Sequence, residues 1–292
     1  MVDKIEVARA LSRALAVDLL TRIRKGAEHL KEPPVLAVVR SSGDAAASYA
    51  ASREKSAREA GIRVVSREFP EGGGADAAGR FLRELSADPG IDAVLVETPL
   101  AAGIDESKLR SALDPAKDAE GLSPANYGRL FSARSWAEVE EGAFPAPPTA
   151  LSIAALARAC GVGIKGLSAL VVGRSNSVGK PAARLLSLLD ATVTLAHSKT
   201  RDLPLLCSRA ELLVACVGRP ECIEAAWVKK GAVVIDAGVH AAGARLVGDV
   251  QASAADRAAF MTPVPGGVGP LTTAYLLNNV LRLARGRDRS AA

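Results

Sequence analysis

Residues 167–186 read LSALVVGRSNSVGKPAARLL, and this stretch decides the fold. It contains an apolar run that predicts a strand, a turn with Gly173 and Gly179, and an amphipathic segment that predicts a helix. Gly173 allows a tight exit from the strand, and Gly179 allows close packing where the helix begins. The free N–H groups at such a helix start can bind a pyrophosphate. The spacing Gly-x-Ser-x3-Gly differs from the usual Gly-x-Gly-x-x-Gly, so an ordinary strand–helix turn remains an alternative.

The residues after the next predicted strand favour NADP as the nucleotide. That strand, ATVTLAH at 191–197, runs into His197-Ser198-Lys199-Thr200. An NAD-selective site usually has an acidic residue here, which binds the ribose 2′-hydroxyl. Hydroxyl groups and a cation stand here instead, and Arg174 follows the first glycine. These donors suit a 2′-phosphate.

Short apolar runs alternate with amphipathic stretches on both sides of this motif, which predicts an α/β protein with mainly parallel sheets. The segment FPAPPTA at 144–150 has three prolines and predicts a rigid connection between two domains. Asp44 is the expected N-cap of one helix and Gly61 its expected C-cap. The predicted strands are 35–40, 62–69, 91–100, 167–173, 191–197, 212–218 and 232–238, and the predicted helices are 46–60, 79–88, 151–161, 177–190 and 272–285.

Composition restricts the class of protein. The chain has 292 residues, which predicts two domains or one large α/β domain, and its 49% hydrophobic content excludes a disordered chain. No apolar run reaches the ~20 residues that span a bilayer, and the first residues do not resemble a signal peptide. We therefore expect a cytoplasmic protein without a membrane partner.

Charge and metal-binding residue types give further expectations. The net charge is +5, from 37 Lys and Arg against 32 Asp and Glu, and it is spread along the chain. This pattern suits an anionic small ligand better than a nucleic acid, for which a basic patch is usual. No two of the four cysteines have CxxC spacing, and the three histidines are scattered, so we expect buried thiols and no metal site.

Several segments, taken together, resemble the bifunctional methylenetetrahydrofolate dehydrogenase/methenyltetrahydrofolate cyclohydrolase family. In the first half they are VLVETPLAAGID and DPAKDAEGLSPANYGRL, and in the second half VVGRSNSVGKP, TVTLAHSKT, KKGAVVIDAGV, LVGDV and TPVPGGVGPLTTA. The resemblance implies two α/β lobes with a cleft between them. Residues 1–146 would form the folate-binding lobe, with the C-terminal helix 271–292 packing back on it, and residues 147–270 a Rossmann-type NAD(P)-binding lobe.

The resemblance also implies an activity and partners. The substrate would be 5,10-methylenetetrahydrofolate, which loses a hydride to NADP and becomes the 5,10-methenyl compound. Water would then open that ring to 10-formyltetrahydrofolate, a step that needs proton transfers. Tetrahydrofolate derivatives would be the ligands, and the family implies a homodimer.

The chain departs from the family pattern in the folate-binding lobe. Tyr49 is kept, but Arg53 stands where the family has lysine, Glu97 where it has glutamine, and Glu120 where it has a second aspartate. The segment 145–148 reads Pro-Ala-Pro-Pro instead of Pro-Cys-Thr-Pro. Arginine stays protonated, whereas lysine can be tuned to give up a proton. We therefore expect weak or absent cyclohydrolase activity and a bidentate Arg53–Glu97 pair.

The resemblance and the motifs together name the candidate site residues. The catalytic candidates are Tyr49, Arg53, Glu97 and Glu120, and the substrate-binding candidates are Pro99, Leu100, Asp118, Pro265, Gly266 and Gly267. The cofactor-binding candidates are Gly173, Arg174, Ser175, Val178, Gly179, His197, Ser198, Lys199, Thr200, Val217, Gly218, Gly238, Val239 and Thr272. Two alternatives stay open: a non-catalytic NADP-binding relative, and a dehydrogenase for a different one-carbon carrier. Tyr49 as a packed helix residue and Glu120 as a solvated turn residue are further alternatives.

Overall fold

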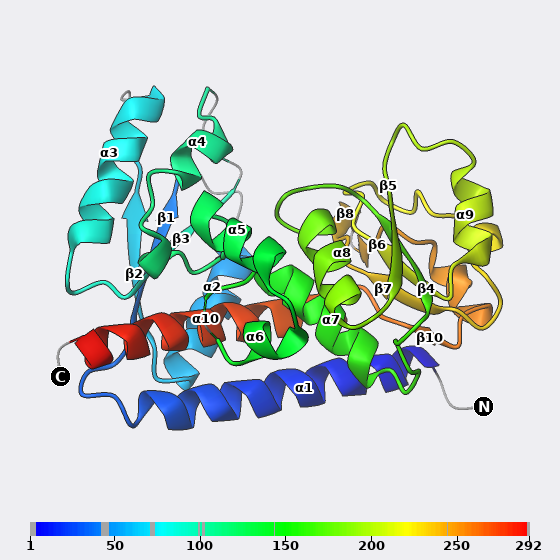
Figure 1. The fold of residues 1–292 in the computed structure, drawn as a ribbon, viewed down its shortest axis with the longest axis horizontal. Helices are drawn as coiled ribbons and strands as arrows, with labels where there is room; N and C mark the ends of the chain where they lie inside the picture. Colours follow the sequence, from blue (N-terminus) through cyan, green and yellow to red (C-terminus); the bar gives the residue numbers. More distant parts are fainter. Residues whose placement is uncertain are drawn as a thin grey trace. The chain divides into compact units, whose positions relative to one another are not determined.

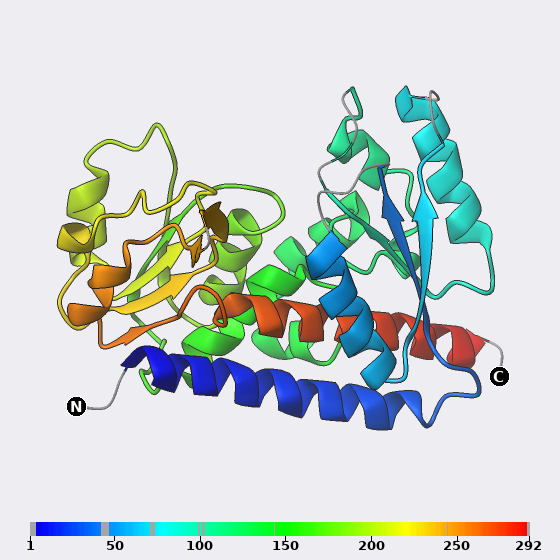
Figure 2. The ribbon, with the colours of Figure 1, turned by 180° about the vertical axis from the view of Figure 1, so that it is seen from behind.

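The computed structural model describes residues 4–41, 47–70, 74–98, 100, 103–142, 144–243 and 245–290. The chain divides into two compact units, which are drawn in Figure 1 and, from behind, in Figure 2. Unit 1 comprises Met1–Val17, Ala133–Glu140 and Pro147–Tyr275. Unit 2 comprises Asp18–Ser132, Glu141–Ala146 and Leu276–Ala292. The predicted domain limits, 1–146 and 147–270, stay a prediction.

Unit 1 is built on a five-stranded parallel sheet in the order β10-β7-β6-β4-β5. The central strands are almost wholly buried, as expected for parallel strands covered on both faces, whereas β5 lies at one edge and is partly exposed. The strands are β4 (Ser168–Val172), β5 (Thr192–Ala196), β6 (Leu212–Ala215), β7 (Val233–Asp236) and β10 (Phe260–Met261), with a separate hairpin of β8 (His240–Ala242) and β9 (Arg245–Val247).

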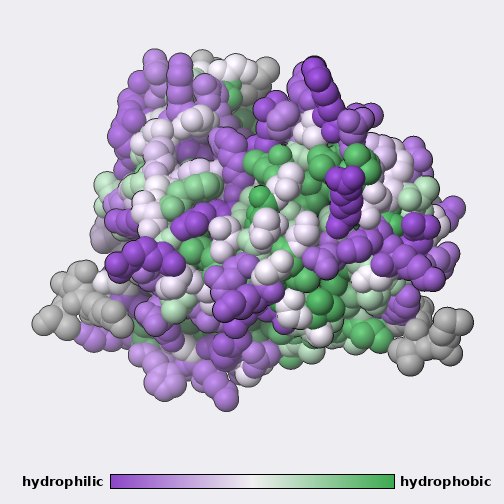
Figure 3. Space-filling model, turned by 45° about the vertical axis from the view of Figure 1, so that its right-hand side comes forward, coloured by the Kyte–Doolittle hydropathy of each residue, from purple (hydrophilic) through white to green (hydrophobic). Residues whose placement is uncertain are grey.

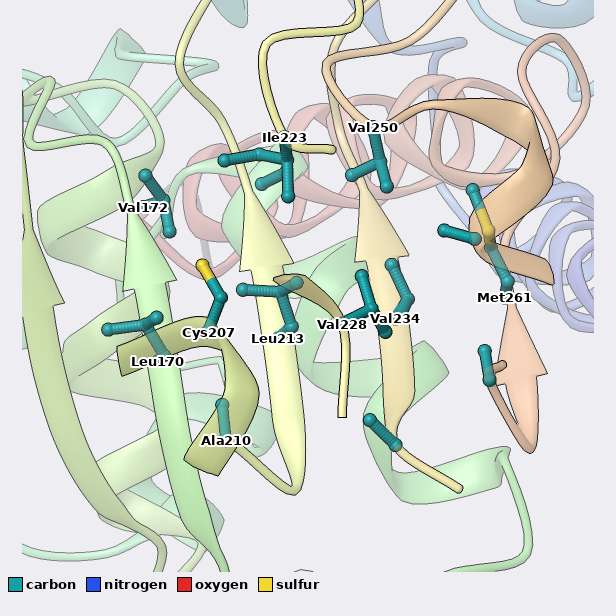
Figure 4. Close-up of a cluster of buried hydrophobic side chains, with 14 of the residues drawn as sticks. Leu170, Val172, Cys207, Ala210, Leu213, Ile223, Val228, Val234, Val250 and Met261 are labelled. Carbon is teal, nitrogen blue, oxygen red and sulfur yellow. The ribbon is translucent and has the colours of Figure 1, made fainter. Parts of the chain in front are cut away.

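The core of unit 1 on one side of the sheet is drawn in Figure 4. Leu170, Leu213, Val234 and Met261 come from four neighbouring strands, and Cys207 of α9 packs with them. Burying each large aliphatic side chain of this kind contributes about 1.5–3 kcal/mol. The helices of unit 1 are α6 (Trp136–Glu140), α7 (Pro148–Ala159), α8 (Gly179–Leu188) and α9 (Leu203–Arg209), with short 3-10 helices η2 (Ala225–Trp227) and η3 (Ala252–Asp256).

Unit 2 is built on a three-stranded parallel sheet in the order β2-β1-β3. Helix α3 packs on one face, where Leu82 and Leu85 belong to one buried cluster with Val39 and Val94, and Figure 2 shows α2 in front of the other face. The strands are β1 (Val35–Arg40), β2 (Arg63–Glu68) and β3 (Ala93–Val96), and the helices are α2 (Ala47–Glu59), α3 (Gly74–Ala87), α4 (Glu106–Arg110), η1 (Pro115–Lys117) and α5 (Pro124–Ser132).

Two long helices contribute residues to both units. Helix α1 runs over Lys4–Ala27 and α10 over Val268–Ser290, whereas the unit boundaries fall at Val17/Asp18 and Tyr275/Leu276. Both helices are therefore continuous through the point at which one unit ends and the other begins.

The predicted fold class is confirmed, and the seven predicted strands are all present: 35–40 has the predicted bounds and the other six are shorter than predicted. The segment FPAPPTA contains the boundary between the two units at Ala146/Pro147, and the helix predicted at 151–161 begins earlier, because Pro148 begins α7 and Pro147 is its N-cap. Proline suits the first helical position, since the amide hydrogen that it lacks has no intrahelical partner there. The expected N-cap Asp44 lies outside the described residues, and Gly61 has φ +76°, as a C-cap glycine requires.

On the face drawn in Figure 3, hydrophilic side chains surround hydrophobic ones. Large apolar side chains exposed at the surface include Phe131, Leu195, Leu205 and Val239. Among the described residues, no helix is long and apolar enough to span a bilayer.

Candidate active site

The first group of candidate residues lies at the carboxyl ends of β4, β5 and β6 in unit 1. The chain goes from β4 to β5 on one side and then returns to β6 on the other side, so the strand order reverses at β4. Ligands of open α/β sheets bind at such a switch point, beyond the carboxyl ends of the strands. Gly173 directly follows β4. Cys216 directly follows β6, and Val217 and Gly218 come next in the chain.

Gly173 and Gly179 are both required by close backbone contacts. Gly173 has φ +129°, and a Cβ there would overlap the carbonyl oxygen of Cys216. A Cβ on Gly179 would overlap the carbonyl oxygen of Gly173. The start of α8 is thus packed directly against the exit of β4, which is the arrangement expected of a dinucleotide-binding turn.

Two backbone amides at the start of α8 share one side-chain acceptor. The Oγ atom of Ser175 accepts hydrogen bonds from the amides of Val178 at 3.1 Å and Gly179 at 3.3 Å. Ser175 is itself exposed. An anion at this helix start would therefore meet amides whose present acceptor is one exposed hydroxyl group.

The turn after β5 presents polar groups on the surface. The His197 amide donates to the Thr200 hydroxyl at 2.8 Å, and the Lys199 amide donates to the His197 Nδ1 at 3.1 Å. Within the described part of the chain, the side chains of Arg174, Ser198 and Lys199 are exposed and make no hydrogen bond or ion pair. These groups fit the 2′-phosphate of NADP, because a cation or hydroxyl without a protein partner can donate to phosphate oxygens.

A buried carboxylate organises the loop after β6, and the sequence analysis missed it. Asp249 is fully buried, and it accepts from the amides of Val217 at 2.5 Å, Gly218 at 3.1 Å and Arg219 at 3.0 Å. His240 lies against the same carboxylate, with Nε2 2.7 Å from Oδ1. The loop that contains two cofactor-binding candidates is thus held by a single side chain.

A second buried carboxylate lies beside the first. Asp236, the last residue of β7, accepts from the amides of Gly238 at 2.9 Å, Asp249 at 3.0 Å and Val250 at 2.9 Å. Burial raises the pKa of Asp236 to about 6, against the effect of these amides. A Cβ on Gly238 would overlap the Asp249 carboxylate, which explains the glycine at this candidate position. The neighbouring candidate Val239 is exposed.

The candidates near the C-terminal helix lie in a turn that α1 holds. Arg9 donates from Nη1 to the carbonyl oxygen of Pro265 at 2.7 Å, and Ser12 donates to the carbonyl oxygen of Gly267. Gly266 between them has φ +98°. Thr272, in the first turns of α10, donates to the carbonyl oxygen of Val268 at 3.1 Å.

The second group of candidates lies in unit 2, where Arg53 and Glu97 form the predicted ion pair. Arg53 lies on α2 and Glu97 directly follows β3, and their side chains are only 8% and 11% exposed. Nη2 of Arg53 donates to Oε1 of Glu97. The predicted ion pair is confirmed, and its bidentate geometry stays a prediction.

A second arginine–glutamate pair involves Glu120 and a residue that sequence analysis missed. Nη1 of Arg110 donates to Oε2 of Glu120 at 2.7 Å, and Nε of Arg110 donates to Glu106 at 2.8 Å. Arg110 is buried, so the interpretation of Glu120 as a freely solvated turn residue is wrong. Burial raises the pKa of Glu120, and the charge of Arg110 opposes that shift.

Asp118 is a buried acceptor next to this pair. It accepts from the amides of Glu120 at 3.1 Å and Ser123 at 2.7 Å, and from the side chain of Asn126 at 3.1 Å. These bonds fix the segment that carries Glu120. Asn279 of α10, also missed, donates to the carbonyl oxygen of Ala119 at 2.9 Å.

The remaining candidates of unit 2 are placed less fully. Tyr49 lies on α2, but its side chain is outside the described part of the structure, as is Pro99. Leu100 is half-buried and packs against the core of unit 2. Whether these side chains contact a ligand stays a prediction.

Cysteine and metal chemistry can be judged within the described residues. All four cysteines are free, but only Cys207 is fully buried, so the prediction of buried thiols is wrong for the half-buried Cys160, Cys216 and Cys222. Burial raises the pKa of the Cys216 thiol to about 12 and that of Cys207 to about 11. No group of three or more His, Cys, Asp or Glu residues suited to a metal ion occurs in the described ranges.

Comparison with known proteins gives concordant results. Residues 6–120 match the model of the tetrahydrofolate dehydrogenase/cyclohydrolase catalytic domain, and residues 147–288 match that of its NAD(P)-binding domain. A Rhodospirillum rubrum protein named bifunctional protein FolD is 45% identical over 293 residues, covering 96% of this chain and 97% of its own.

Two solved structures are also similar. The bifunctional FolD enzyme from Campylobacter jejuni has a TM-score of 0.86 at 30% identity, covering 94% of this chain and 98% of its own. The Trypanosoma brucei methylenetetrahydrofolate dehydrogenase-cyclohydrolase, solved with NADP cofactor and inhibitor, has a TM-score of 0.81 at 32% identity, covering 100% and 98%.

Proposed function

The chain belongs to the tetrahydrofolate dehydrogenase/cyclohydrolase family, and we propose that it is a dehydrogenase of this family whose hydrolytic step is slow or absent. The dehydrogenase activity itself follows from the family: oxidation of 5,10-methylenetetrahydrofolate to 5,10-methenyltetrahydrofolate with NADP. The proposal about hydrolysis rests on one observation, the buried Arg53–Glu97 ion pair of unit 2.

The residues of unit 1 account for cofactor binding in this proposal. The amides at the start of α8 would hold the pyrophosphate, and Arg174, Ser198 and Lys199 the 2′-phosphate. Asp249 keeps the loop of Val217 in place. When bound, NADP supplies the acceptor for the hydride that leaves the substrate carbon.

Hydride removal and ring opening make different demands on the residues of unit 2. Hydride removal needs the substrate to be positioned, and buried side chains in fixed pairs can do that. Ring opening by water needs a group that takes up and releases a proton. Arg53 keeps its proton at any working pH, and its pair with Glu97 fixes both groups. The arrangement therefore favours the first step over the second.

The test follows both steps by absorbance in one protein preparation. Methylenetetrahydrofolate and NADP are added and the formation of NADPH is recorded; methenyltetrahydrofolate is then added separately and its decay is corrected for the rate in buffer alone. We expect NADPH formation with little decay above the buffer rate. Decay as fast as NADPH formation would refute the proposal about hydrolysis, whereas NADP binding without NADPH formation would indicate a non-catalytic relative.

We also propose that the protein is a homodimer, in line with the family resemblance. The edge strand β5 of unit 1 supports this proposal, because Leu195 is 38% exposed there and Thr192 and Thr194 are exposed as well. An edge strand of this kind offers backbone groups and apolar surface to a second chain. Light scattering after size exclusion should give twice the chain mass, and a mass of one chain would contradict the proposal.

A further inference from the structure

A cavity of about 710 Å³ lies in unit 2, away from the candidate folate site. Ile91 and Asp92, which precede β3, line it, whereas Glu97 follows the other end of that strand. Figures 1 and 2 show the C-terminal half of α10 passing the amino ends of β1 and β2, with the arrowheads directed away from it. The cavity and the Arg53–Glu97 pair therefore lie at opposite ends of the sheet.

The lining of the cavity is strongly basic. Five cations line it against two carboxylates: Lys117, Arg129, Arg282, Arg285 and Arg287 against Asp92 and Glu141. Arg287 is bound to Asp92 at 2.9 Å and so neutralises one carboxylate. The known partners of Arg129 and Lys117 are uncharged, namely the Asn126 amide oxygen and the Asp88 carbonyl oxygen. The lining thus contains three more cations than carboxylates.

Two of the arginines are seated against glycine residues. A Cβ on Gly142 would lie 2.8 Å from Nε of Arg282, and a Cβ on Gly26 would lie 2.5 Å from Nη2 of Arg285. These glycines leave the space that the two guanidinium side chains occupy. In the described part of the chain, Arg285 has no hydrogen bond or ion pair. The Arg285 guanidinium is exposed and can therefore donate to an oxyanion.

The rest of the lining is apolar. Pro89, Ile91, Pro115, Phe144, Pro145 and Leu283 contribute to it. The volume lies within the range of small-molecule sites, which combine apolar walls with a few polar groups. Inorganic phosphate would use the cations and leave the apolar walls in contact with water.

We propose that this cavity binds a small organic polyphosphate, with its phosphate groups on Arg282, Arg285 and Lys117 and its organic part against the apolar walls. A nucleoside triphosphate is the probe of this chemistry. This binding site is separate from the NADP site, which the residues of unit 1 form.

Isothermal titration calorimetry of the full chain with ATP, tripolyphosphate and adenosine tests the proposal. We expect ATP to bind more tightly than tripolyphosphate, and adenosine to show no measurable binding. The variant Arg282→Gln/Arg285→Gln should bind ATP at least about tenfold more weakly, since each lost charge-assisted hydrogen bond carries a large share of the affinity. The control Arg80→Gln/Arg83→Gln removes two exposed cations from α3 of the same unit and should leave ATP binding unchanged.

Two further variants are titrated with ATP in the same way, one in the cavity and one in the nucleotide site of unit 1. Lys117→Gln should weaken ATP binding in the same direction even if the double variant folds poorly. Arg174→Gln reports on the nucleotide site of unit 1. If ATP binding falls in Arg174→Gln but not in the cavity variants, ATP occupies the NADP site and the proposal is overturned. Equal ATP affinity in the original protein and both cavity variants, or no ATP binding at millimolar concentration, would overturn it as well.

Discussion

The buried pair of Arg53 and Glu97 limits the proton transfers that unit 2 can perform. Both side chains are nearly excluded from water, so separating them would leave an unpaired charge in the interior. The two side chains therefore stay paired in the folded protein. Chemistry at these two positions can change only if both residues change together.

Exchange of both residues should therefore increase ring opening. The variant Arg53→Lys with Glu97→Gln supplies an amine beside a neutral amide, and we expect hydrolysis of methenyltetrahydrofolate to rise, by up to ~10²–10⁴-fold for a restored general acid/base. Arg53→Lys alone should gain much less, because Glu97 would keep the new amine protonated. The measurement is the decay of methenyl absorbance, with the dehydrogenase rate as the control. Equal gains from the single and double variants would contradict this account.

Arg174 should set the preference between the two nicotinamide cofactors. In Arg174→Ala the binding free energy for NADP should weaken by roughly 1.5–3 kcal/mol, the value of a charge-assisted hydrogen bond, while NAD binding stays nearly constant. Dissociation constants for both cofactors, measured by fluorescence titration, check this expectation. The matched control is Arg209→Ala, which removes an exposed arginine of α9. An unchanged preference in Arg174→Ala would show that the phosphate lies elsewhere.

At the scale of elements, the junction of β4 and α8 depends on backbone atoms in direct contact. Gly179 lies so close to the carbonyl oxygen of Gly173 that a side chain cannot be added without moving the helix start. The amides at that start are the ones expected to bind pyrophosphate. Cofactor binding and local packing are thus linked at one residue.

Gly179→Ala should therefore weaken NADP binding and destabilise unit 1. Overpacking of this kind costs about 1–3 kcal/mol. The matched control is Gly163→Ala, in the loop before β4, where an added Cβ would meet no atom within 4 Å. Thermal melting with and without NADP measures both effects. A Gly179→Ala protein that melts and binds like the control would refute the close contact.

The sequence predicts this junction and the strands well because both depend on local patterns. The apolar runs at 35–40 and 212–218 contain β1 and β6, and the glycines mark the turn. Helix α1 was not predicted, since the buried positions of its part in unit 1, Ala8, Ser12 and Ala16, form a narrow stripe of small residues. Asp249 was missed because its partners are backbone amides, which leave no spacing pattern in the sequence. Arg110 was missed because its bond to Glu120 joins α4 to the turn after η1, so helical spacing shows only its other partner, Glu106.

At the scale of the whole molecule, pH should act through Asp236. Its pKa is raised by burial to about 6 from the ordinary 3.8, so the unfolded chain loses the proton first as pH rises. The contribution of Asp236 to the free energy of unfolding should therefore be largest below about pH 4, decrease as pH rises to 6 and then stay constant, by roughly 1.4 kcal/mol for each pH unit of the shift. Denaturant unfolding between pH 4 and 8 should show this contribution, and Asp236→Asn should remove it. The control is Asp256→Asn, at an exposed position. If unfolding free energy changes with pH equally in Asp236→Asn and in the control, Asp236 is not the source of the pH dependence.

Activity should not depend on a bound metal ion. Hydride transfer to nicotinamide needs none, and the predicted site is made of arginine, carboxylate and backbone groups. Protein treated with a chelator and then dialysed should retain its dehydrogenase rate within experimental error. Activity lost on chelation and restored only by zinc would contradict this prediction.

The continuity of α1 and α10 has a consequence for dissecting the protein. The turn around Gly266 depends on Arg9 and Ser12, which lie more than 250 residues away along the chain. A gene fragment that starts at Pro147 encodes all the strands of unit 1 but leaves this turn without its donors. Unit 1 therefore cannot be moved into another protein as this single fragment. Transplanting it into another protein requires a circularly permuted design, in which the first turns of α1 are joined to the same fragment.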